Sequence, residues 1–436
     1  MSDARLEWTN WTGDQTCNPA TIVRPGSLDE VAMALVDARE RDLTVRVAGA
    51  GHSFTDTVLT NGMLLSLDGM NKVLEIDRDA GMVRVEAGIS LRTLSERLDD
   101  EGLALPNLGD IDVQSLAGAI ATGTHGTGLR LQSMAAGIAS MQLALADGSV
   151  IEVGENDDAD VLRAASVSIG ALGVITAVTL KTVPAFTLHA VDRPQPLFEV
   201  LENLDELAET NDHFEFYNFP YSDIALTRVN NRVDDPPRPR SRAKAWIDDV
   251  LIVNHLLALV CRTGRRFPRT ITRLNRLAPR VAGTSERVDR SYLIFSSRRD
   301  VRFTEMEYAL PRAQATRAVS AVREIVERNG FSVPLPMEVR FVAADEAWLS
   351  PAHDRETCYI AVHMFEGMEW GGFFRSVEAA MTDLGGRPHW GKRHFQDAAS
   401  LSKMYPEWAR FASVRTRLDP EGRFTNAYVE RVLGRP

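Results

Sequence analysis

The segment AGAGHSFTD, residues 48–56, sets the strongest local constraint on how this chain folds. It follows the apolar run LTVRV at residues 43–47, so a buried strand leads directly into a glycine-rich turn. Turns of this kind commonly bind phosphate, because glycine lets backbone N–H groups approach an anion closely. Backbone amides need no histidine for that purpose. His52 is therefore a structural residue, a catalyst or an attachment point for a ligand.

A second glycine-rich segment, residues 109–128, reads GDIDVQSLAGAIATGTHGTG. Its small side chains and hydroxyl groups can bring backbone N–H and side-chain O–H donors close to an anionic ligand. Neither segment matches the Walker phosphate-binding loop or the Gly-x-Gly-x-x-Gly dinucleotide fingerprint. Glycine content alone supports ligand binding and tight backbone packing equally, so both interpretations stay open at this point.

The composition narrows the class of protein. A chain of 436 residues, 44% of them hydrophobic, can bury a substantial core and is long enough for two or three domains. Its formal net charge of -11 argues against a nucleic-acid-binding protein, since such proteins need a basic surface to neutralise phosphates. The three cysteines are far apart, match no zinc spacing and cannot all pair. We therefore predict no metal site and a reducing, cytoplasmic location. The N-terminal residues also lack the pattern of a signal peptide.

Two other segments need separate interpretation. The basic residues at positions 238–244 lie among prolines, and we expect a solvated loop there rather than a contact with a polyanion or a membrane. The apolar run at residues 250–261 is shorter than the roughly 20 residues that span a bilayer, and it contains Asn254 and His255. We expect a buried helix there, with shallow membrane docking as the alternative.

Local patterns predict that helices alternate with short strands in the N-terminal part. Ser27 and Glu30 form a capping-box pattern before a helix that ends near Asp42. A second helix is expected to start at Ser90 and to be capped by Gly102. Strands are expected at residues 64–67, 73–76, 82–87, 138–145, 150–153 and 169–180.

Several motifs follow the glycine-rich segments in a recognisable order. They are HFEFYNFP (213–220), EMEYALP (305–311), MEVRFV (337–342), HWGK (389–392) and DPEGRFTNAY (419–428). In this order, and over nearly the whole chain, they closely resemble the vanillyl-alcohol-oxidase-type FAD-linked oxidoreductases. Within that superfamily the chain is most similar to the aldonolactone oxidase and dehydrogenase group, which is related to alditol oxidase.

The resemblance implies an α+β fold: a two-subdomain PCMH-type FAD-binding domain, and an α+β substrate-binding cap domain with an antiparallel sheet. The sequence changes near residues 181–186 to strands and longer helices with more aromatic residues. We therefore assign the FAD-binding domain to residues 1–183 and the cap domain to residues 184–388. Residues 389–436 are expected to return to the flavin site, with a turn at residues 419–424 that closes the chain over the core.

By this resemblance the two glycine-rich segments hold FAD around its pyrophosphate, and His52 matches the histidine that often bonds covalently to the flavin C8 methyl group. A neutral imidazole is a competent nucleophile toward that methyl group. A histidine that forms a hydrogen bond beside a non-covalent FAD is the alternative. The predicted cofactor-binding residues, from these segments and the strand expected at 169–180, are Ala48, Gly49, Ala50, Gly51, His52, Ser53, Gly109, Ser115, Gly118, Thr122, Thr124, His125, Gly126, Gly173 and Ile175.

Flavin-dependent oxidation of an alcohol requires transfer of a hydride, removal of the hydroxyl proton and a countercharge for the reduced ring. Glu338 and Arg340 alternate in an extended segment, so their side chains point the same way. The resemblance implies that Glu338 holds substrate hydroxyls and that Arg340 stabilises the anionic reduced flavin, while a structural ion pair is the alternative. Lys392 matches a lysine that lies at the substrate in alditol oxidases. It either orients the reacting hydroxyl or, with a depressed pKa, accepts its proton; a surface lysine is the alternative.

Three positions bear on the electron acceptor and the substrate. Gly109 matches a position near the reactive edge of the flavin, where the missing side chain leaves room for oxygen and favours an oxidase. Asp110 stands where alditol oxidases have a serine that contacts substrate, and with EMEYALP this difference favours sugar lactones over linear polyols. Asn218 stands where many lactone oxidases have tryptophan, which puts the substrate pocket in doubt.

We therefore predict an FAD-dependent enzyme that oxidises the CH–OH group of an aldono-1,4-lactone, such as a gulono- or arabinono-lactone. Oxygen or a redox protein would then accept the electrons. The alternatives are an alditol or other sugar-alcohol oxidase of the same superfamily, and a flavin- or sugar-binding protein that has lost catalysis. A reductase of nucleotide-linked enolpyruvyl sugars would need NADPH, and the Glu-x-Arg and HWGK motifs argue against it.

Overall fold

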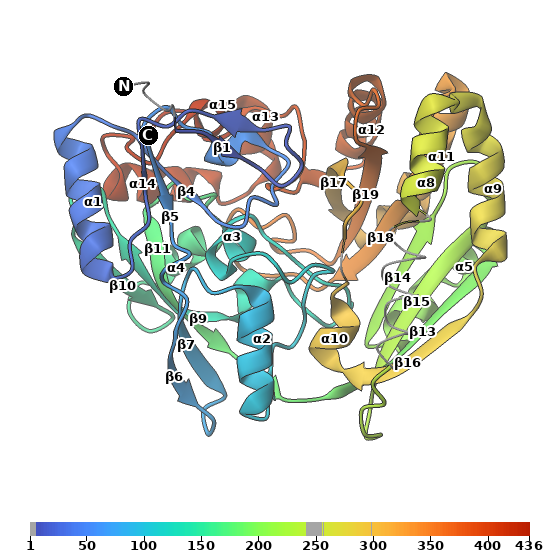
Figure 1. Cartoon of the computed structure of the whole chain (residues 1–436), viewed down its shortest axis with the longest axis horizontal. Helices are drawn as coiled ribbons and strands as arrows, with labels where there is room; N and C mark the ends of the chain where they lie inside the picture. Colours follow the sequence, from blue (N-terminus) through green and yellow to red (C-terminus); the bar gives the residue numbers. More distant parts are fainter. Residues whose placement is uncertain (1–5, 241–254, 256, 298) are drawn as a thin grey trace.

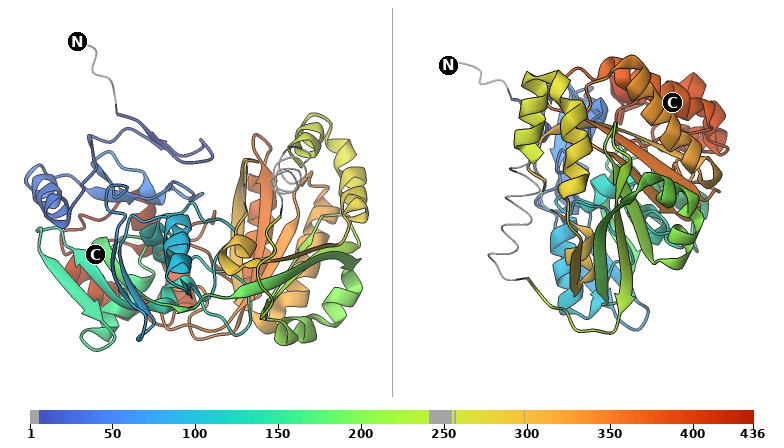
Figure 2. Two further views of the ribbon diagram at one scale, coloured as in Figure 1. Left: turned by 60° about the horizontal axis from the view of Figure 1, so that its bottom comes forward. Right: turned by 90° about the vertical axis from the view of Figure 1, so that its right-hand side faces the viewer.

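The computed structural model describes residues 6–240, 255, 257–297 and 299–436. Two halves lie side by side along the longest axis of the molecule (Figure 1). One half contains the first and the last of the described residues, and the other is built on a large sheet from the middle of the sequence (Figures 1 and 2).

The first half begins with a small parallel sheet in the order β3-β5-β4. Its strands are β3 (Thr21–Val23), β4 (Val45–Ala48) and β5 (Met63–Ser66). Helix α1 (Leu28–Glu40) connects β3 to β4, since parallel strands need a crossover. Ser27 caps α1 as predicted, because its hydroxyl accepts a hydrogen bond from Glu30 N–H at 3.3 Å. The Glu30 carboxylate reaches back to Gly26 N–H at 2.8 Å rather than to Ser27.

A five-stranded antiparallel sheet in the order β10-β9-β11-β7-β6 follows in the same half. Its strands are β6 (Val73–Asp77), β7 (Met82–Glu86), β9 (Ile138–Ala144), β10 (Val150–Gly154) and β11 (Val174–Lys181). Three helices and two pairs of short strands complete this part: α2 (Leu91–Asp100), α3 (Leu116–Ala121), α4 (Ala159–Ser166), β1 (Trp8–Thr9) with β2 (Thr16–Cys17), and β8 (Leu103–Ala104) with β12 (Val183–Pro184).

The helices and strands predicted for this half are confirmed, apart from the start of the last strand. Helix α2 follows its cap Ser90, and Gly102 behind it has a φ of +72°, which glycine adopts readily. The strand predicted at residues 169–180 begins only at Val174, because Ile169 and Gly170 have φ values of +47° and +68°. Residues 169–173 therefore form a loop.

The second half is an antiparallel sheet in the order β16-β13-β15-β14-β18-β19-β17-β20. Its strands are β13 (Thr187–Pro196), β14 (His213–Asn218), β15 (Ile224–Val233), β16 (Ser285–Arg290), β17 (Phe303–Pro311), β18 (Met337–Val342), β19 (Thr357–Phe365) and β20 (Arg387–Pro388). One face of the sheet is apolar, with Phe216, Met306 and Val339 in its core. The helices packed on this face are α5 (Leu197–Glu202), α6 (Leu204–Thr210), α11 (Ala315–Asn329) and α12 (Gly371–Asp383).

The end of the chain returns to the first half (Figure 1). Helices α13 (Ala398–Met404), α14 (Trp408–Leu418) and α15 (Ala427–Leu433) bury side chains in the same core as α1 and α2. The predicted turn at residues 419–424 is present, since the Asp419 carboxylate accepts hydrogen bonds from Arg423 N–H at 2.7 Å and Phe424 N–H at 2.9 Å.

Two helices, α8 (Leu257–Arg266) and α9 (Ile271–Val281), lie at the outer end of the second half, and the short α10 (Ser291–Phe295) follows them. Half of the apolar run predicted as a buried helix, residues 250–254 and 256, lies outside the described residues. Residues 257–261 of the run form the start of α8, with Cys261 buried. The basic run is described only to residue 240, where Arg238 is exposed and pairs with Asp235 at 2.6 Å. No described helix is long and apolar enough to cross a membrane.

Candidate active site

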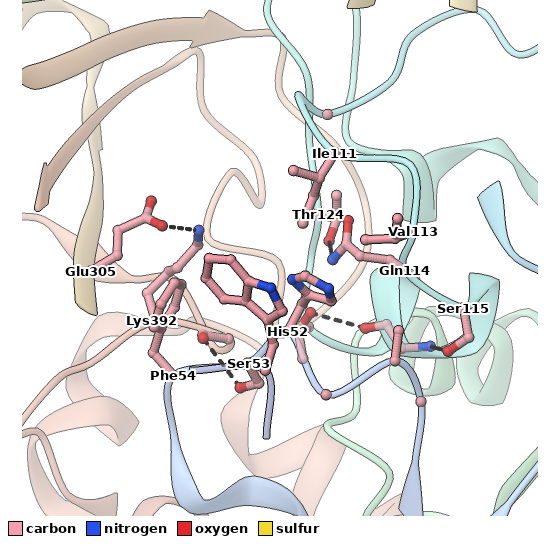
Figure 3. Close-up of a pocket in the computed structure, with 18 of the residues that line it drawn as sticks. His52, Ser53, Phe54, Ile111, Val113, Gln114, Ser115, Thr124, Glu305 and Lys392 are labelled. Carbon is pink, nitrogen blue, oxygen red and sulfur yellow. Dashed lines mark hydrogen bonds and ion pairs between the residues drawn. The ribbon is translucent and has the colours of Figure 1, made fainter. Parts of the chain in front are cut away.

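A cavity of about 610 Å³ lies between the two halves and collects almost all the predicted site residues. The glycine-rich segments line it from the first half, and strands β14, β17, β18 and β19 line it from the second. Figure 3 shows His52 and Ser115 beside this space, with Lys392 and Glu305 across from Ser115. Of the predicted residues only Gly126 lies outside the lining. A Cβ at Gly126 would come within 2.2 Å of Asn107 Oδ1, so glycine is needed there for packing.

The two glycine-rich segments contact each other directly. A Cβ at Gly49 would lie 2.2 Å from Ser115 Oγ, so only glycine permits this approach. Ser115 caps α3 by accepting a hydrogen bond from Gly118 N–H at 3.3 Å, and Gly51 reverses the first segment with a φ of +71°. Within the described part of the chain, the backbone N–H groups of residues 50–53 donate to no protein acceptor. These donors are available to a ligand.

His52 lines the cavity and stacks on Trp11, with ring centroids 5.1 Å apart and ring planes 24° apart. Burial and, to a smaller extent, the positive charge of Lys392 lower the pKa of His52 to about 4, although Asp110 opposes the shift. The imidazole is therefore neutral near neutral pH. This is the protonation state in which a histidine nitrogen can act as a nucleophile.

The HWGK motif holds the tip of the first glycine-rich segment. Phe54 N–H and the Ser53 hydroxyl both donate to the carbonyl oxygen of Gly391, at 2.8 and 3.1 Å. The Thr55 hydroxyl donates to the neighbouring Trp390 carbonyl at 3.3 Å. Because Lys392 follows directly, these bonds place His52 and Lys392 at the same cavity (Figure 3).

The second face of the large sheet is polar and carries most of the charge in the cavity. Side chains alternate along a strand, and strand pairing sets Glu215 opposite Arg340 and Glu305 opposite His363. The residues that share this face include Glu215, Tyr217, Glu305, Glu307, Glu338, Arg340 and His363. Of these residues, only Glu338 and Arg340 were predicted from the sequence. The same alternation in HFEFYNFP and EMEYALP could have identified the others.

Arg340 lies among several carboxylates. It forms an ion pair with Glu338, and its Nε lies 2.9 Å from Glu215 Oε2, although the N–H is not aligned for a hydrogen bond. Burial lowers the pKa of Arg340, but Glu338 and Glu215 outweigh it and raise the pKa well above its usual value. Glu338 also accepts a hydrogen bond from the Tyr217 hydroxyl at 3.0 Å. Burial raises the pKa of Glu338 in spite of Arg340.

Lys392 lines the cavity and its Nζ donates to Glu305 Oε2 at 2.5 Å. Burial lowers the pKa of Lys392, but the carboxylates of Glu305 and Glu307 outweigh this cost and raise it. The side chain is therefore an ammonium group. His363 lies on the other side of Glu305 at 3.6 Å, and its Nδ1 is 2.9 Å from the Pro336 carbonyl oxygen.

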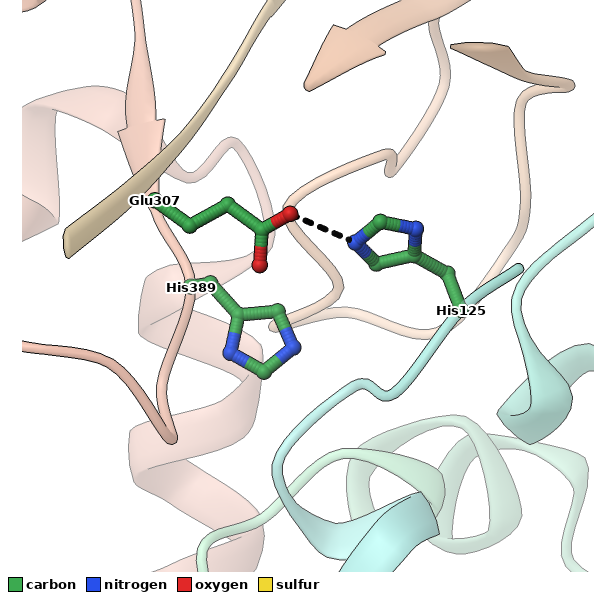
Figure 4. A group of neighbouring side chains, drawn as sticks. All are labelled: His125, Glu307 and His389. Atoms are coloured by element: carbon green, nitrogen blue, oxygen red, sulfur yellow. Dashed lines mark ion pairs between the residues drawn. The ribbon is translucent and has the colours of Figure 1, made fainter. Parts of the chain in front are cut away.

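Two histidines surround Glu307 in a buried cluster (Figure 4). His125 Nε2 lies 3.3 Å from Glu307 Oε1, and its Nδ1 donates to the Gly126 carbonyl at 2.9 Å. His389 Nδ1 accepts from Gly391 N–H at 3.1 Å, so Nε2 carries the ring proton and neither nitrogen offers a free lone pair. His389 is thus held by the backbone beside the His125–Glu307 pair, and all three side chains line the cavity.

The structure places two unusual positions, Asp110 and Asn218, in different environments. Asp110 lines the cavity and pairs with Arg299 at 3.0 Å. Burial raises the pKa of Asp110, but Arg299 and Arg340 together hold it below its usual value. Asn218 is buried on the opposite face of β14, where its amide donates to the Ser222 and Ile224 carbonyls. Asn218 does not line the cavity, so the doubt that it raised about the substrate pocket is removed.

The unpaired backbone N–H groups and the open cavity on the side of the first half fit FAD. Residues 50–53 offer unpaired backbone N–H groups for a pyrophosphate, and Gly49 allows the two segments to close together. The cavity volume lies within the range of roughly 300–1,000 Å³ that is typical of cofactor pockets.

Comparisons with known proteins agree with this site. A family described as "FAD binding domain" matches residues 19–154, and one described as "D-arabinono-1,4-lactone oxidase" matches residues 178–432. An L-gulono-1,4-lactone dehydrogenase from Mycobacterium tuberculosis is 49% identical over 98% of this chain and 99% of its own length. The L-gulonolactone oxidase of Mus musculus is 35% identical, and the alditol oxidase of a Streptomyces species is 31% identical, each over 98% of both chains.

A solved structure, "Solvent-stable cholesterol oxidase", covers 98% of this chain and 97% of its own with a TM-score of 0.84 and 16% identity. This likeness confirms the predicted fold class, a PCMH-type FAD-binding domain with an α+β cap. FAD binding and oxidoreductase activity are likewise confirmed. With a family match over more than half its length, the chain belongs to the D-arabinono-1,4-lactone oxidase family of FAD-dependent oxidoreductases.

Proposed function

We propose that this protein oxidises the CH–OH group of an aldono-1,4-lactone of the gulono or arabinono type. One observation carries the proposal: Lys392 and the Glu338–Arg340 pair face the same cavity as the glycine-rich cradle. The full-length relatives with lactone names support this choice of substrate. The cytoplasm is the proposed compartment, since all three cysteines are free thiols.

When bound, FAD supplies the hydride acceptor. The residues proposed to hold it are those of the two glycine-rich segments, with His52 as the covalent attachment point. Gly173 and Ile175 line the same cavity from the first half.

The residues on the polar face of the sheet act on the substrate. The Lys392 ammonium group donates a hydrogen bond to the reacting hydroxyl and orients it, because its raised pKa keeps it charged. The pKa of Glu338 is raised, whereas those of Glu305 and Asp110 are lowered. Glu338 is therefore the stronger base of these three and the proposed acceptor of the hydroxyl proton.

Arg340 supplies a permanent positive charge at this wall of the cavity. Tyr217, held by Glu215 at 2.9 Å and by Glu338, presents a hydroxyl for further hydroxyl groups of the sugar. A dense set of hydrogen-bond donors and acceptors suits an uncharged ligand with several hydroxyls.

An anaerobic titration tests the proposed substrate. Purified flavin-loaded protein is mixed with gulono- and arabinono-1,4-lactone, with the matching alditols and with the free sugars, and the visible absorbance of the flavin is followed. We expect the lactones to bleach the flavin fastest, and Glu338→Gln to slow bleaching by about 10²–10⁴-fold. Faster bleaching by alditols would assign the chain to the alternative activity. No bleaching by any compound would leave only a binding role.

A further inference from the structure

Helices α8 and α9 form a surface of unusual composition at the outer end of the molecule. They stand side by side in Figure 1 and lie at the outer edge in both views of Figure 2. Their buried faces rest on the same segment: Asn275 of α9 donates to the Val333 carbonyl at 2.8 Å, and a Cβ at Gly264 of α8 would lie 3.7 Å from Pro334 Cβ. The opposite faces of both helices therefore point away from the body of the protein.

The exposed residues follow helical stripes. In α9 they are spaced i, i+3, i+4, i+7 and i+8, which is one face of a helix. In α8 three of them are spaced i, i+3 and i+7, and Arg265 is exposed beside them. The stripes consist of Arg273, Arg276, Leu277, Arg280 and Val281 in α9, and of Leu259, Arg262 and Arg266 in α8. We call these residues, with Phe267 and Arg269 of the connecting turn, the basic helix face.

The basic helix face combines positive charge with large exposed apolar side chains. Residues 257–281 contain seven arginines and no aspartate or glutamate, although the chain as a whole has a net charge of -11. Within the described part of the chain, none of these arginines pairs with a carboxylate. Four apolar side chains lie among them with high exposure: Leu259 at 59%, Phe267 at 56%, Leu277 at 56% and Val281 at 72%.

We propose that the basic helix face docks the protein on the surface of an anionic phospholipid bilayer. Arginines attract anionic headgroups, while the apolar side chains between them enter the boundary between headgroups and acyl chains. An acidic protein or a nucleic acid would pair with the charges but would leave these four side chains without an apolar partner. The mixture of arginines and exposed apolar side chains therefore favours a bilayer.

The first turn of α8 also reaches the cavity. Leu257, in the first turn of α8, lines the cavity together with Leu335 from the segment that supports both helices. The surface is thus connected to the active site through one turn of helix.

Flotation with large unilamellar vesicles tests the proposal on the flavin-loaded full chain. We expect the protein to float with vesicles of phosphatidylglycerol and phosphatidylcholine in equal parts, to stay behind with phosphatidylcholine alone, and to be released as salt is raised. The triple variant Arg262→Gln, Arg273→Gln, Arg280→Gln should bind about a hundredfold more weakly, since each basic residue contributes about fivefold.

A matched control removes the same charge elsewhere. Arg24→Gln, Arg97→Gln and Lys403→Gln change exposed residues in other elements, and this triple should float like the wild type. Leu277→Gln with Val281→Gln should reduce flotation even at low salt, because it removes only apolar contacts. All variants should keep their flavin spectrum.

Three results would overturn the proposal. Equal loss of flotation in the control triple would show an effect of net charge alone. Equal flotation with phosphatidylcholine vesicles would show that headgroup charge plays no part. Absence of flotation combined with salt-sensitive retention on polyglutamate or duplex DNA would assign the basic helix face to an acidic protein or a nucleic acid.

Discussion

His52 combines a lowered pKa with a fixed position in the flavin cavity, and both properties follow from its neighbours. Burial, the charge of Lys392 and stacking on Trp11 keep the ring neutral and oriented. We predict that flavin fluorescence stays with the polypeptide after acid precipitation of the wild type. In His52→Ala the flavin should appear in the supernatant, while Ser53→Ala should behave like the wild type. Release of flavin from the wild type would disprove the covalent bond and leave the FAD site intact.

Lys392 owes its raised pKa to the carboxylates around it, of which Glu305 at 2.5 Å is the nearest. As a hydrogen-bond donor it must keep its proton, so the rate of flavin reduction should fall as pH rises through the pKa of Lys392. Replacing Glu305 by Gln removes the negative charge and lowers that pKa. We therefore predict that the alkaline limb of the pH–rate profile moves to lower pH in Glu305→Gln and stays in place in Glu305→Asp. An unmoved limb in Glu305→Gln would exclude Lys392 as the titrating group.

Gly109 allows a test of the electron acceptor that leaves the fold unchanged. A Cβ there would meet Thr124 Cγ2 and the His125 carbonyl oxygen at 3.4 Å, an ordinary contact. We predict that Gly109→Ala slows reoxidation by oxygen by about tenfold, or about 1.4 kcal/mol in the barrier. Anaerobic reduction by substrate and reoxidation by an artificial dye should remain unchanged. Unaltered reaction with oxygen would show that this position does not control oxygen access.

Strand β4 carries a buried arginine, Arg46, that no sequence motif predicted. The Arg46 guanidinium donates to four backbone carbonyls, those of Thr57, Ile169, Gly170 and Phe424. We predict that Arg46→Met lowers the free energy of unfolding by about 3–5 kcal/mol, because it leaves these buried acceptors unpaired. The midpoint of urea unfolding measures the loss. Arg97→Met on the exposed side of α2 is the control and should change the midpoint little.

The elements of this fold that the sequence predicts are those marked by local sequence patterns, such as helix caps and alternating side chains. Ser27 and Ser90 mark the first two helices, and the alternation of Glu338 and Arg340 gives their shared face. Arg46 could not be predicted in this way, since two of its acceptors lie 124 and 378 residues away in sequence. Residues 169–173 were predicted as part of a strand and form a loop instead. The positive φ values of this loop depend on its contacts with other segments, which the local strand pattern does not reveal. Spacing reveals which residues share a face, but not which distant carbonyl completes a site.

The cavity is assembled from both halves and from the end of the chain, so its stability is a property of the whole molecule. Gly391 fixes the tip of the first glycine-rich segment, and Arg299 of the second half pairs with Asp110 of the second segment. The division into domains at residues 183 and 388 stays a prediction. The contacts across these boundaries mean that FAD, by binding where the halves meet, should stabilise all parts together.

Asn426 connects the end of the chain to the segment that carries His52, and it provides the sharpest test of this coupling. Its side-chain amide donates to the carbonyls of Asp56, Thr57 and Leu59 at 2.8–3.1 Å, and its oxygen caps α15 by accepting from Val429 N–H at 2.8 Å.

Asn426→Asp keeps the cap but removes the three donations, whereas Asn426→Ala removes both. We predict that each variant lowers the free energy of unfolding by about 2–4 kcal/mol and reduces the flavin content of the purified protein, since each leaves buried carbonyls unpaired. Urea unfolding and the ratio of flavin to protein absorbance measure the two effects. If Asn426→Asp matched the wild type, the residue would act only as a helix cap, and the C-terminal segment would not support the flavin loop through it.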